Sequence, residues 1–274
     1  MGSKEIQAHV TGTYRNLRRG LTFMGFAFPL VLWIVGFLWF GVPFQRSMSD
    51  YYFAESAGPG IVPSLLKQVD LWPIKQLLFF LDQFDPHTPM RSWFVGLLFV
   101  LGVLMILYSG FSRLENWLLN AAGVLAVGVA LFPTGCDNCP PITLHGTCAI
   151  SAFVLLVLVA VFCAKQTLTI GLAPARATFY RHLYNVTATL MLVFPLAAVV
   201  VTWVWGLFGQ STHFVFFAEL LGLWCFALYW YIKSRELAEN RAEIHAVEGR
   251  LTSTHALMRT MPSLGLKQLE LAPD

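Results

Sequence analysis

Six apolar segments divide this chain of 274 residues, and each is about as long as a membrane-spanning helix. A helix needs roughly 20 apolar residues to cross the hydrocarbon core of a bilayer. The six segments are residues 21–41, 93–111, 117–133, 144–164, 184–208 and 214–232. They predict an all-α, polytopic membrane protein with six transmembrane helices. Hydrophobic residues make up 57% of the chain and charged residues only 12%, a composition that a soluble domain of this length does not have.

The basic residues are divided unevenly between the two sides that six spans define. Fourteen of the 18 lysines and arginines lie in the N-terminal segment, in the connections after the second and fourth spans, and in the tail. Basic residues near helix ends favour the cytoplasmic side. We therefore predict that both termini are cytoplasmic, with residues 1–20 as an N-terminal segment, residues 21–233 as the bundle and residues 234–274 as a tail. The basic residues form no stripe, so we predict no nucleic-acid binding.

The outer connection between the first two spans, residues 53–90, is long enough to have structure of its own. Apolar residues recur at helical spacing from Pro63 to Phe84, and charged residues interleave with them. Pro73 is expected to break or kink this run. The pattern predicts a helix in the membrane interface or a lid segment packed on the outer helix ends.

The tail carries one narrow apolar stripe that repeats every seven residues. Its members are Leu237, Ile244, Leu251 and Met258. We expect the tail to be helical to about residue 261, because Pro262 cannot continue a helix. The stripe is expected to dock on the protein's own cytoplasmic loops or on a partner helix.

Glu219 is the best single candidate for function, because it lies inside the sixth span. At the helical rise, its position corresponds to a depth of about 9 Å. An ionisable group at that depth is costly unless it faces the bundle interior and finds a partner. The plain alternative is a structural hydrogen bond to Arg91, Asn185 or a tyrosine.

Three histidines, His87, His145 and His213, are predicted on the outer side together with several carboxylates. Such groups could hold a divalent metal if they converged from separate elements. No local His-x-x-x-His pair is present, and histidines also commonly cap or hydrogen-bond helix ends. We therefore assign no metal and no cofactor.

The five cysteines fall into two groups. Cys163 and Cys225 lie in apolar spans and are expected to be small core residues. The other three, Cys136, Cys139 and Cys148, surround the connection between the third and fourth spans. In an oxidising compartment we expect two of these three to form a disulfide. A metal clip that also uses His145 is the alternative.

Five sequence blocks of this chain belong together as a pattern. They are Ser-Met-Ser-Asp-Tyr-Tyr at 47–52, Met-Arg-Ser-Trp-Phe-Val-Gly at 90–96, a block at 120–134 that ends in Ala-Leu-Phe-Pro-Thr, Leu-His-Gly at 144–146, and Glu219 with Trp224 and Trp230. In this combination the chain resembles an uncharacterised family of bacterial six-span inner-membrane proteins over residues 45–235. The resemblance implies an architecture and a location in the bacterial inner membrane, but no activity. Residues 53–90 separate two blocks that lie close together in the family pattern, and the cysteine cluster is a local addition.

The motif side chains all belong to outer helix ends or to the outer half of a span. We predict that Asp50, Tyr51, Arg91, His145 and Glu219 form a small polar pocket, which a charge pair between Asp50 and Arg91 would close. Its ligand would be a membrane lipid headgroup or another small amphipathic molecule.

Three functions stay open at this point, and the sequence does not decide whether the protein is an enzyme. The first is a membrane protein with this outward-facing ligand pocket. The second is an accessory or structural subunit of a larger membrane complex, and the third is a metal-dependent hydrolase embedded in the membrane.

Overall fold

The computed structural model describes residues 3–69, 71–81, 87–132, 143–207, 213–240 and 242, and the regular elements of this part of the chain are all helical. They are α1 (Ser3–Leu30), η1 (Val31–Val35), α2 (Gly36–Phe40), η2 (Ser49–Tyr52), α3 (Ile61–Leu66), α4 (Trp72–Leu81), α5 (Met90–Leu107), α6 (Arg113–Leu131), α7 (Leu144–Leu158), η3 (Val159–Cys163), η4 (Ala164–Thr167), α8 (Pro174–Leu207) and α9 (Phe214–Asn240). Six helical stretches are long and apolar enough to span a membrane: His9–Phe40, Met90–Leu107, Arg113–Leu131, Leu144–Thr167, Pro174–Trp205 and Phe214–Asn240. The all-α prediction and the six helices capable of spanning a membrane are confirmed.

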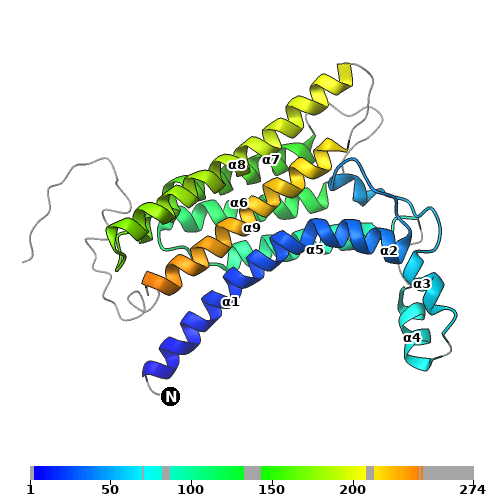
Figure 1. Cartoon of the computed structure of the whole chain (residues 1–274), viewed down its shortest axis with the longest axis horizontal. Coiled ribbons are helices and arrows are strands. Elements are labelled where there is room, and N and C mark those ends of the chain that lie inside the picture. Colours follow the sequence, from blue (N-terminus) through cyan, green and yellow to red (C-terminus); the bar gives the residue numbers. More distant parts are fainter. Residues whose placement is uncertain are drawn as a thin grey trace, which may run out of the picture.

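The six long helices form a bundle in which α9 is the most enclosed member (Figure 1). Helix α9 packs along both α1 and α8, while α6 lies between α5 and α7. In the apolar stretch of α9, 61% of the residues are buried, compared with 24–39% in the apolar stretches of the other five spans. The helices at the periphery of the bundle instead expose large apolar side chains such as Phe23 (69%), Val124 (62%) and Trp203 (69%). A bundle with an apolar exterior of this kind suits a lipid environment.

The two ends of the bundle differ in what they carry (Figure 1). At one end lie residues 47–52, the start of α5, the start of α7 and the start of α9; we call this the motif end. At the other end lie the start of α1 and the last turns of α9; we call this the termini end. Both ends of the described chain therefore lie on the same side of the bundle, as six spans require.

The first span begins much earlier than the predicted residue 21, because α1 already starts at Ser3. Buried Thr11 and Arg18 belong to this extension, so the predicted N-terminal segment is part of the bundle. Near its other end, Pro29 lies inside α1 and is followed by the π-helical turn η1. Proline has no N–H to donate, so the regular hydrogen-bond ladder shifts at this point.

A tight contact between two glycine-containing segments ends the first span. Gly41 adopts a left-handed conformation (φ 62°) after α2, which only glycine adopts without strain. A side chain at Gly41 would collide with the carbonyl of Gly58, and one at Gly60 would collide with the backbone of Trp39. The loop is fastened further by Ser56 Oγ, which donates to the Phe40 carbonyl at 2.6 Å. The segment 57–60 thus turns the chain away from the bundle.

The outer insertion contains helices, as its periodicity predicts, but as two short ones, α3 and α4. The break between them lies before Pro73, which takes an early position in α4, where its missing N–H costs no helical hydrogen bond. Helix α4 exposes Trp72 (73%), Phe79 (66%) and Phe80 (67%). These exposed rings suit the predicted place in a membrane interface.

Candidate functional site

Residues 47–52 form a single compact turn at the motif end. The Ser47 N–H donates to Asp50 Oδ2 at 3.1 Å, and the Asp50 N–H donates to Ser47 Oγ at 3.1 Å. This reciprocal pair resembles a helix capping box and fixes the turn before η2. The Arg46 carbonyl accepts the Phe216 N–H at 2.8 Å, which ties the turn to the start of α9.

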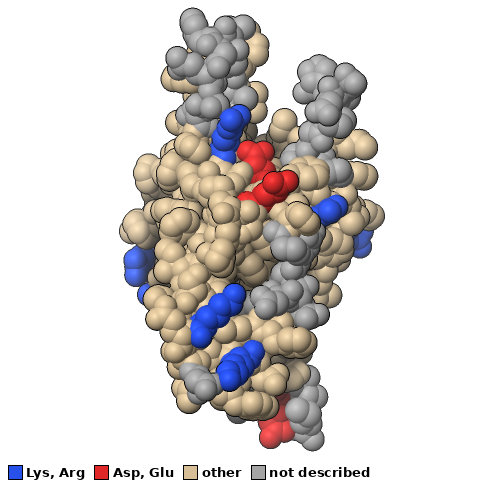
Figure 2. All heavy atoms as spheres, turned by 90° about the vertical axis from the view of Figure 1, so that its right-hand side faces the viewer, with Lys and Arg blue, Asp and Glu red and all other residues tan. Residues whose placement is uncertain are grey.

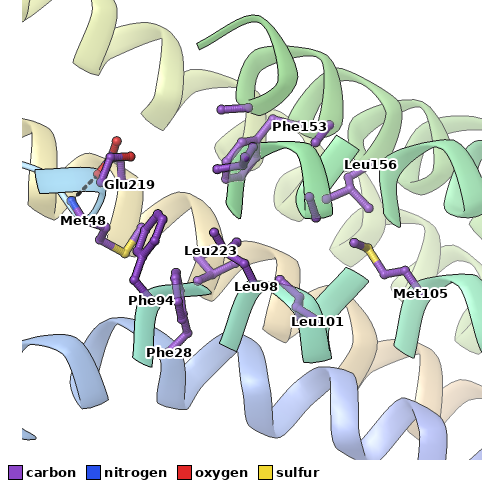
Figure 3. Close-up of a pocket in the computed structure, with 15 residues that line it drawn as sticks. Phe28, Met48, Phe94, Leu98, Leu101, Met105, Phe153, Leu156, Glu219 and Leu223 are labelled. Atoms are coloured by element: carbon purple, nitrogen blue, oxygen red, sulfur yellow. Dashed lines mark hydrogen bonds between the residues drawn. The ribbon is translucent and has the colours of Figure 1, made fainter. Parts of the chain in front are cut away.

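Glu219, on α9, is engaged by this turn. Its Oε2 accepts the Met48 N–H at 2.7 Å, as the dashed line in Figure 3 shows. A hydrogen bond to a carboxylate is short and roughly twice as strong as one between neutral groups. Its other oxygen, Oε1, receives no hydrogen bond from any residue that the structure describes. Among the described contacts, the predicted partners Arg91 and Asn185 make no hydrogen bond with Glu219.

His145, in the first turn of α7, connects the same turn to the end of α6. Its Nδ1 lies 2.9 Å from the Phe132 carbonyl, which can only accept, so Nδ1 carries the proton. Its Nε2 lies 2.8 Å from Ser49 Oγ and is therefore the acceptor of the serine hydroxyl. The ring is almost fully buried and stacks on Phe94.

Arg91 does not close the pocket in the way the sequence suggests. Its Nη2 donates to the Tyr52 hydroxyl at 2.8 Å, and its guanidinium lies 4.5 Å from the centre of the Tyr52 ring. Among the described contacts Asp50 has no ion pair with Arg91, because the Asp50 carboxylate accepts the Ser47 N–H within the turn. The predicted Asp50–Arg91 pair is therefore wrong, and a cation–π contact takes its place.

Tyr51 packs in the core beside Phe216 and is fully buried. Burial raises the pKa of Tyr51 to about 12, although the backbone of Gln45 acts in the opposite direction. Its role at this end is to fill space beneath the turn.

A cavity of about 100 Å³ extends from the turn into the bundle between α1, α5, α6, α7 and α9. Among the described residues, only Glu219 and Ser49 bring polar side chains to its wall. Figure 3 shows Glu219 and Met48 at one end of the cavity, with Leu98 and Leu101 farther along and Met105 near the opposite end. The cavity is thus amphipathic, with one polar end, which we call its mouth, and an apolar interior.

Figure 2 looks onto the motif end from outside the bundle. Uncharged side chains cover most of the visible face, the basic side chains are scattered over it, and acidic side chains are seen in a small group in its upper half and again at its lower edge. Charge on this face is thus sparse and of both signs.

The three candidate metal-binding histidines do not gather. His213 Nδ1 lies 3.1 Å from the Gln45 carbonyl and its ring packs on Phe44, while His145 is held by Ser49 and Phe132. Within the described ranges no three His, Cys, Asp or Glu side chains form a group that could hold a metal ion. His87 lies before α5.

The cysteines separate as the sequence suggests, but without the expected disulfide at Cys148. Cys163 and Cys225 are buried free thiols in the spans. Cys148 is also a free thiol, and its sulfur packs beside Gly128 on α6, so a disulfide that uses Cys148 is wrong. Cys136 and Cys139 lie outside the described residues.

A second polar group, at the termini end, was not foreseen. Lys233 and Glu236 on α9 are both completely inaccessible and lie 3.0 Å apart. Glu236 also accepts hydrogen bonds from Thr167 (2.6 Å), Tyr184 (2.6 Å) and Asn240 (2.8 Å). We call these five residues the Lys233–Glu236 network. Its signal in the sequence is a pair of opposite charges at i, i+3 near the end of the sixth span.

Leu237 follows directly after this network and is 2% exposed, because α9 continues to Asn240. The first member of the apolar stripe therefore packs inside the protein itself. Ile244, Leu251 and Met258 lie outside the described residues.

Comparison with known proteins gives no match, since no protein-family model, no curated protein and no solved structure is similar to this chain.

Proposed function

We propose that this chain is an integral membrane protein that binds a small amphipathic molecule at the motif end, on the side facing away from the cytoplasm. The observation that carries the proposal is a single carboxylate, Glu219, at the mouth of an otherwise apolar cavity. The orientation rests on the distribution of the basic residues, and the bacterial inner membrane as location rests on the resemblance of the sequence blocks.

The polar mouth favours a ligand head that donates hydrogen bonds. Glu219 Oε1 is available as an acceptor, and Ser49 Oγ keeps lone pairs free while it donates to His145. A protonated amine satisfies both oxygens and neutralises the carboxylate. A carboxylate head would face Glu219 as a like charge. The ligand class that fits is therefore a primary amine with a short apolar tail.

The cavity volume limits the tail. An engineered apolar cavity of ~150 Å³ takes up benzene, and the present cavity of about 100 Å³ is of the same order. It suits an alkyl tail of a few carbons among Leu98, Leu101 and Met105, and it is too small for a diacyl lipid.

The proposal is tested by measuring thermal unfolding in a mild detergent with n-hexylamine, n-hexanol and hexanoate as probes. Hexylamine is expected to raise the melting temperature the most. Glu219→Gln should weaken its apparent affinity by about tenfold, the difference between a charged and a neutral hydrogen bond. Glu55→Gln removes an exposed carboxylate outside the cavity lining and is the control. Equal responses to all three probes, or equal losses in both variants, would contradict the proposal.

A second candidate function is ester hydrolysis, favoured by the hydrogen bond between Ser49 and His145. A nucleophile, a base and a group that orients the base are the elements of an activated serine. Here Ser49 Oγ would attack an acyl carbonyl, His145 Nε2 would take the hydroxyl proton, and the Phe132 carbonyl would orient the ring. The alcohol would leave with that proton, and water would then release the acid from Ser49.

A fluorophosphonate probe distinguishes this candidate from simple ligand binding. Labelling of Ser49 that is lost in Ser49→Ala and His145→Ala, but kept in Ser56→Ala, would support hydrolysis. Absence of labelling in folded protein would contradict hydrolysis and leave amine binding as the remaining candidate.

A further inference from the structure

A second cavity, of about 690 Å³, lies between α1 and α9 at the termini end. Four arginines line it, Arg15, Arg18 and Arg19 from α1 and Arg235 from α9, and among the described residues no aspartate or glutamate does. We call it the arginine cavity. Arg18 and Arg19 follow Arg15 by three and four residues, so both lie on the same side of the helix as Arg15.

Three of these four arginines carry a charge that no described residue neutralises. Arg15, Arg19 and Arg235 are exposed and make no hydrogen bond or ion pair with any residue in the described part of the chain. The hydroxyl of Ser234, which also lines the cavity, is a buried polar atom without a partner there. Guanidinium groups that line one cavity without a carboxylate from the described residues favour an anion among them.

Other basic residues at the same end behave differently. Arg176 lies 3.0 Å from Glu239 and is compensated by it. A purely topological role requires positive charge at this end of the bundle, but it does not require several uncompensated arginines around one cavity. The grouping therefore calls for a ligand.

The wall of the arginine cavity changes from polar to apolar along α1. Phe23 and Phe26 line its far part, and Phe23 is 69% exposed. Arg15 and Phe23 are eight residues apart, about 12 Å along a helix. A phosphate among the arginines would thus have an apolar surface one short chain segment away, where an acyl chain can lie.

We propose that the arginine cavity binds the phosphate group of an anionic phospholipid, with part of an acyl chain along Phe23 and Phe26. Basic pockets between transmembrane helices are suited to such headgroups. This site is at the opposite end of the bundle from the amine-binding cavity and does not depend on it.

The test measures thermal unfolding of the full chain in mild detergent, with phosphatidylglycerol, phosphatidylcholine or inorganic phosphate added separately. Phosphatidylglycerol is expected to stabilise the protein, and the other two are not. The triple variant Arg15→Gln, Arg19→Gln, Arg235→Gln should lose at least about tenfold in apparent affinity for phosphatidylglycerol, which is 1.4 kcal/mol.

The control is a second triple variant, Arg113→Gln, Arg176→Gln, Arg181→Gln. It removes the same charge from the same end but leaves the arginine cavity intact, so its affinity should stay within about twofold of the wild type. If the first triple variant does not fold, Arg235→Gln alone should lose roughly fivefold.

Equal loss in the two triple variants would overturn the proposal, because it would show a general effect of charge. Stabilisation by inorganic phosphate alone, equal to that by the lipid, would also overturn it, because the site would then be specific for a free anion.

Discussion

Replacing Lys233 by methionine is expected to destabilise the protein strongly, because it removes one partner of a fully buried ion pair. Lys233 Nζ contacts Glu236, the hydroxyl of Thr167 and the Ala164 carbonyl. Breaking a buried pair by removing one partner typically costs about 3–5 kcal/mol, since the other charge is left without compensation. Glu236 would still receive hydrogen bonds from Thr167, Tyr184 and Asn240. We therefore expect a loss near the lower limit, about 3 kcal/mol.

Reversible unfolding by SDS in mixed micelles measures this loss as a change in the free energy of unfolding. The chain contains its own control pair, Arg176 and Glu239, which also lie 3.0 Å apart but are 57% and 34% exposed. Arg176→Met should cost less than about 1 kcal/mol, because water and salt screen an exposed pair. The double variant Lys233→Met, Glu236→Leu should lose less than the sum of its two single changes, since it leaves no lone charge. Equal effects of Lys233→Met and Arg176→Met would refute the reasoning.

Three further predictions follow from the packing and the orientation of the bundle. Because burial raises the pKa of Tyr51 from 10.0 to about 12, the unfolded state loses the phenol proton first. The contribution of Tyr51 to stability should therefore be constant below pH 10 and fall as the pH rises toward 12, and pH-dependent unfolding of Tyr51→Phe should show a smaller fall over this range. Gly102→Val should lower the free energy of unfolding by roughly 1–3 kcal/mol, because its Cβ would meet the backbone of α6, whereas Gly96→Val in the same helix enters open space and should have little effect. In a cysteine-free background, an impermeant maleimide should label Glu55→Cys in intact cells but Arg176→Cys only after permeabilisation, and the reverse pattern would invert the proposed orientation.

The periodicity and length of the apolar segments predicted the fold class well, because a membrane leaves a chain few alternatives to helices. Helix ends were predicted less well. Helix α1 begins at Ser3 and thus also includes residues 3–20, although the hydropathy of that segment is low. Tertiary packing stabilises this part of the helix, because Thr11 and Arg18 are buried there. Helix α9 continues past the predicted end at residue 232 for the same reason.

Topology also explains why part of the candidate site was foreseeable. Asp50, His145 and Glu219 were each assigned to one end of the bundle, and the turn of residues 47–52 does contact both His145 and Glu219. The particular partners could not be deduced, because they depend on side-chain directions. Arg91 turns to Tyr52, and Ser49 rather than Asp50 meets His145.

The Lys233–Glu236 network was missed because charge near the end of a span usually serves topology. Its burial depends on Thr167 and Tyr184, which come from two other elements. A spacing of three residues between opposite charges on a helix is compatible with a solvated pair as well as a buried one. Only the arrangement of the neighbouring helices decides between them.

The central claim, an amine-binding cavity with Glu219 at its mouth, is tested most directly by photoaffinity labelling. The probe is a primary alkylamine of roughly six carbons with a diazirine at the end of its tail, a length chosen for the volume of the cavity. Labelled residues are identified by peptide mass mapping, with and without an excess of hexylamine. The account predicts labels at Leu101, Met105 or Leu156 that hexylamine removes and that Glu219→Gln weakens. Labels confined to outward-facing residues such as Val103, unchanged by either treatment, would contradict it.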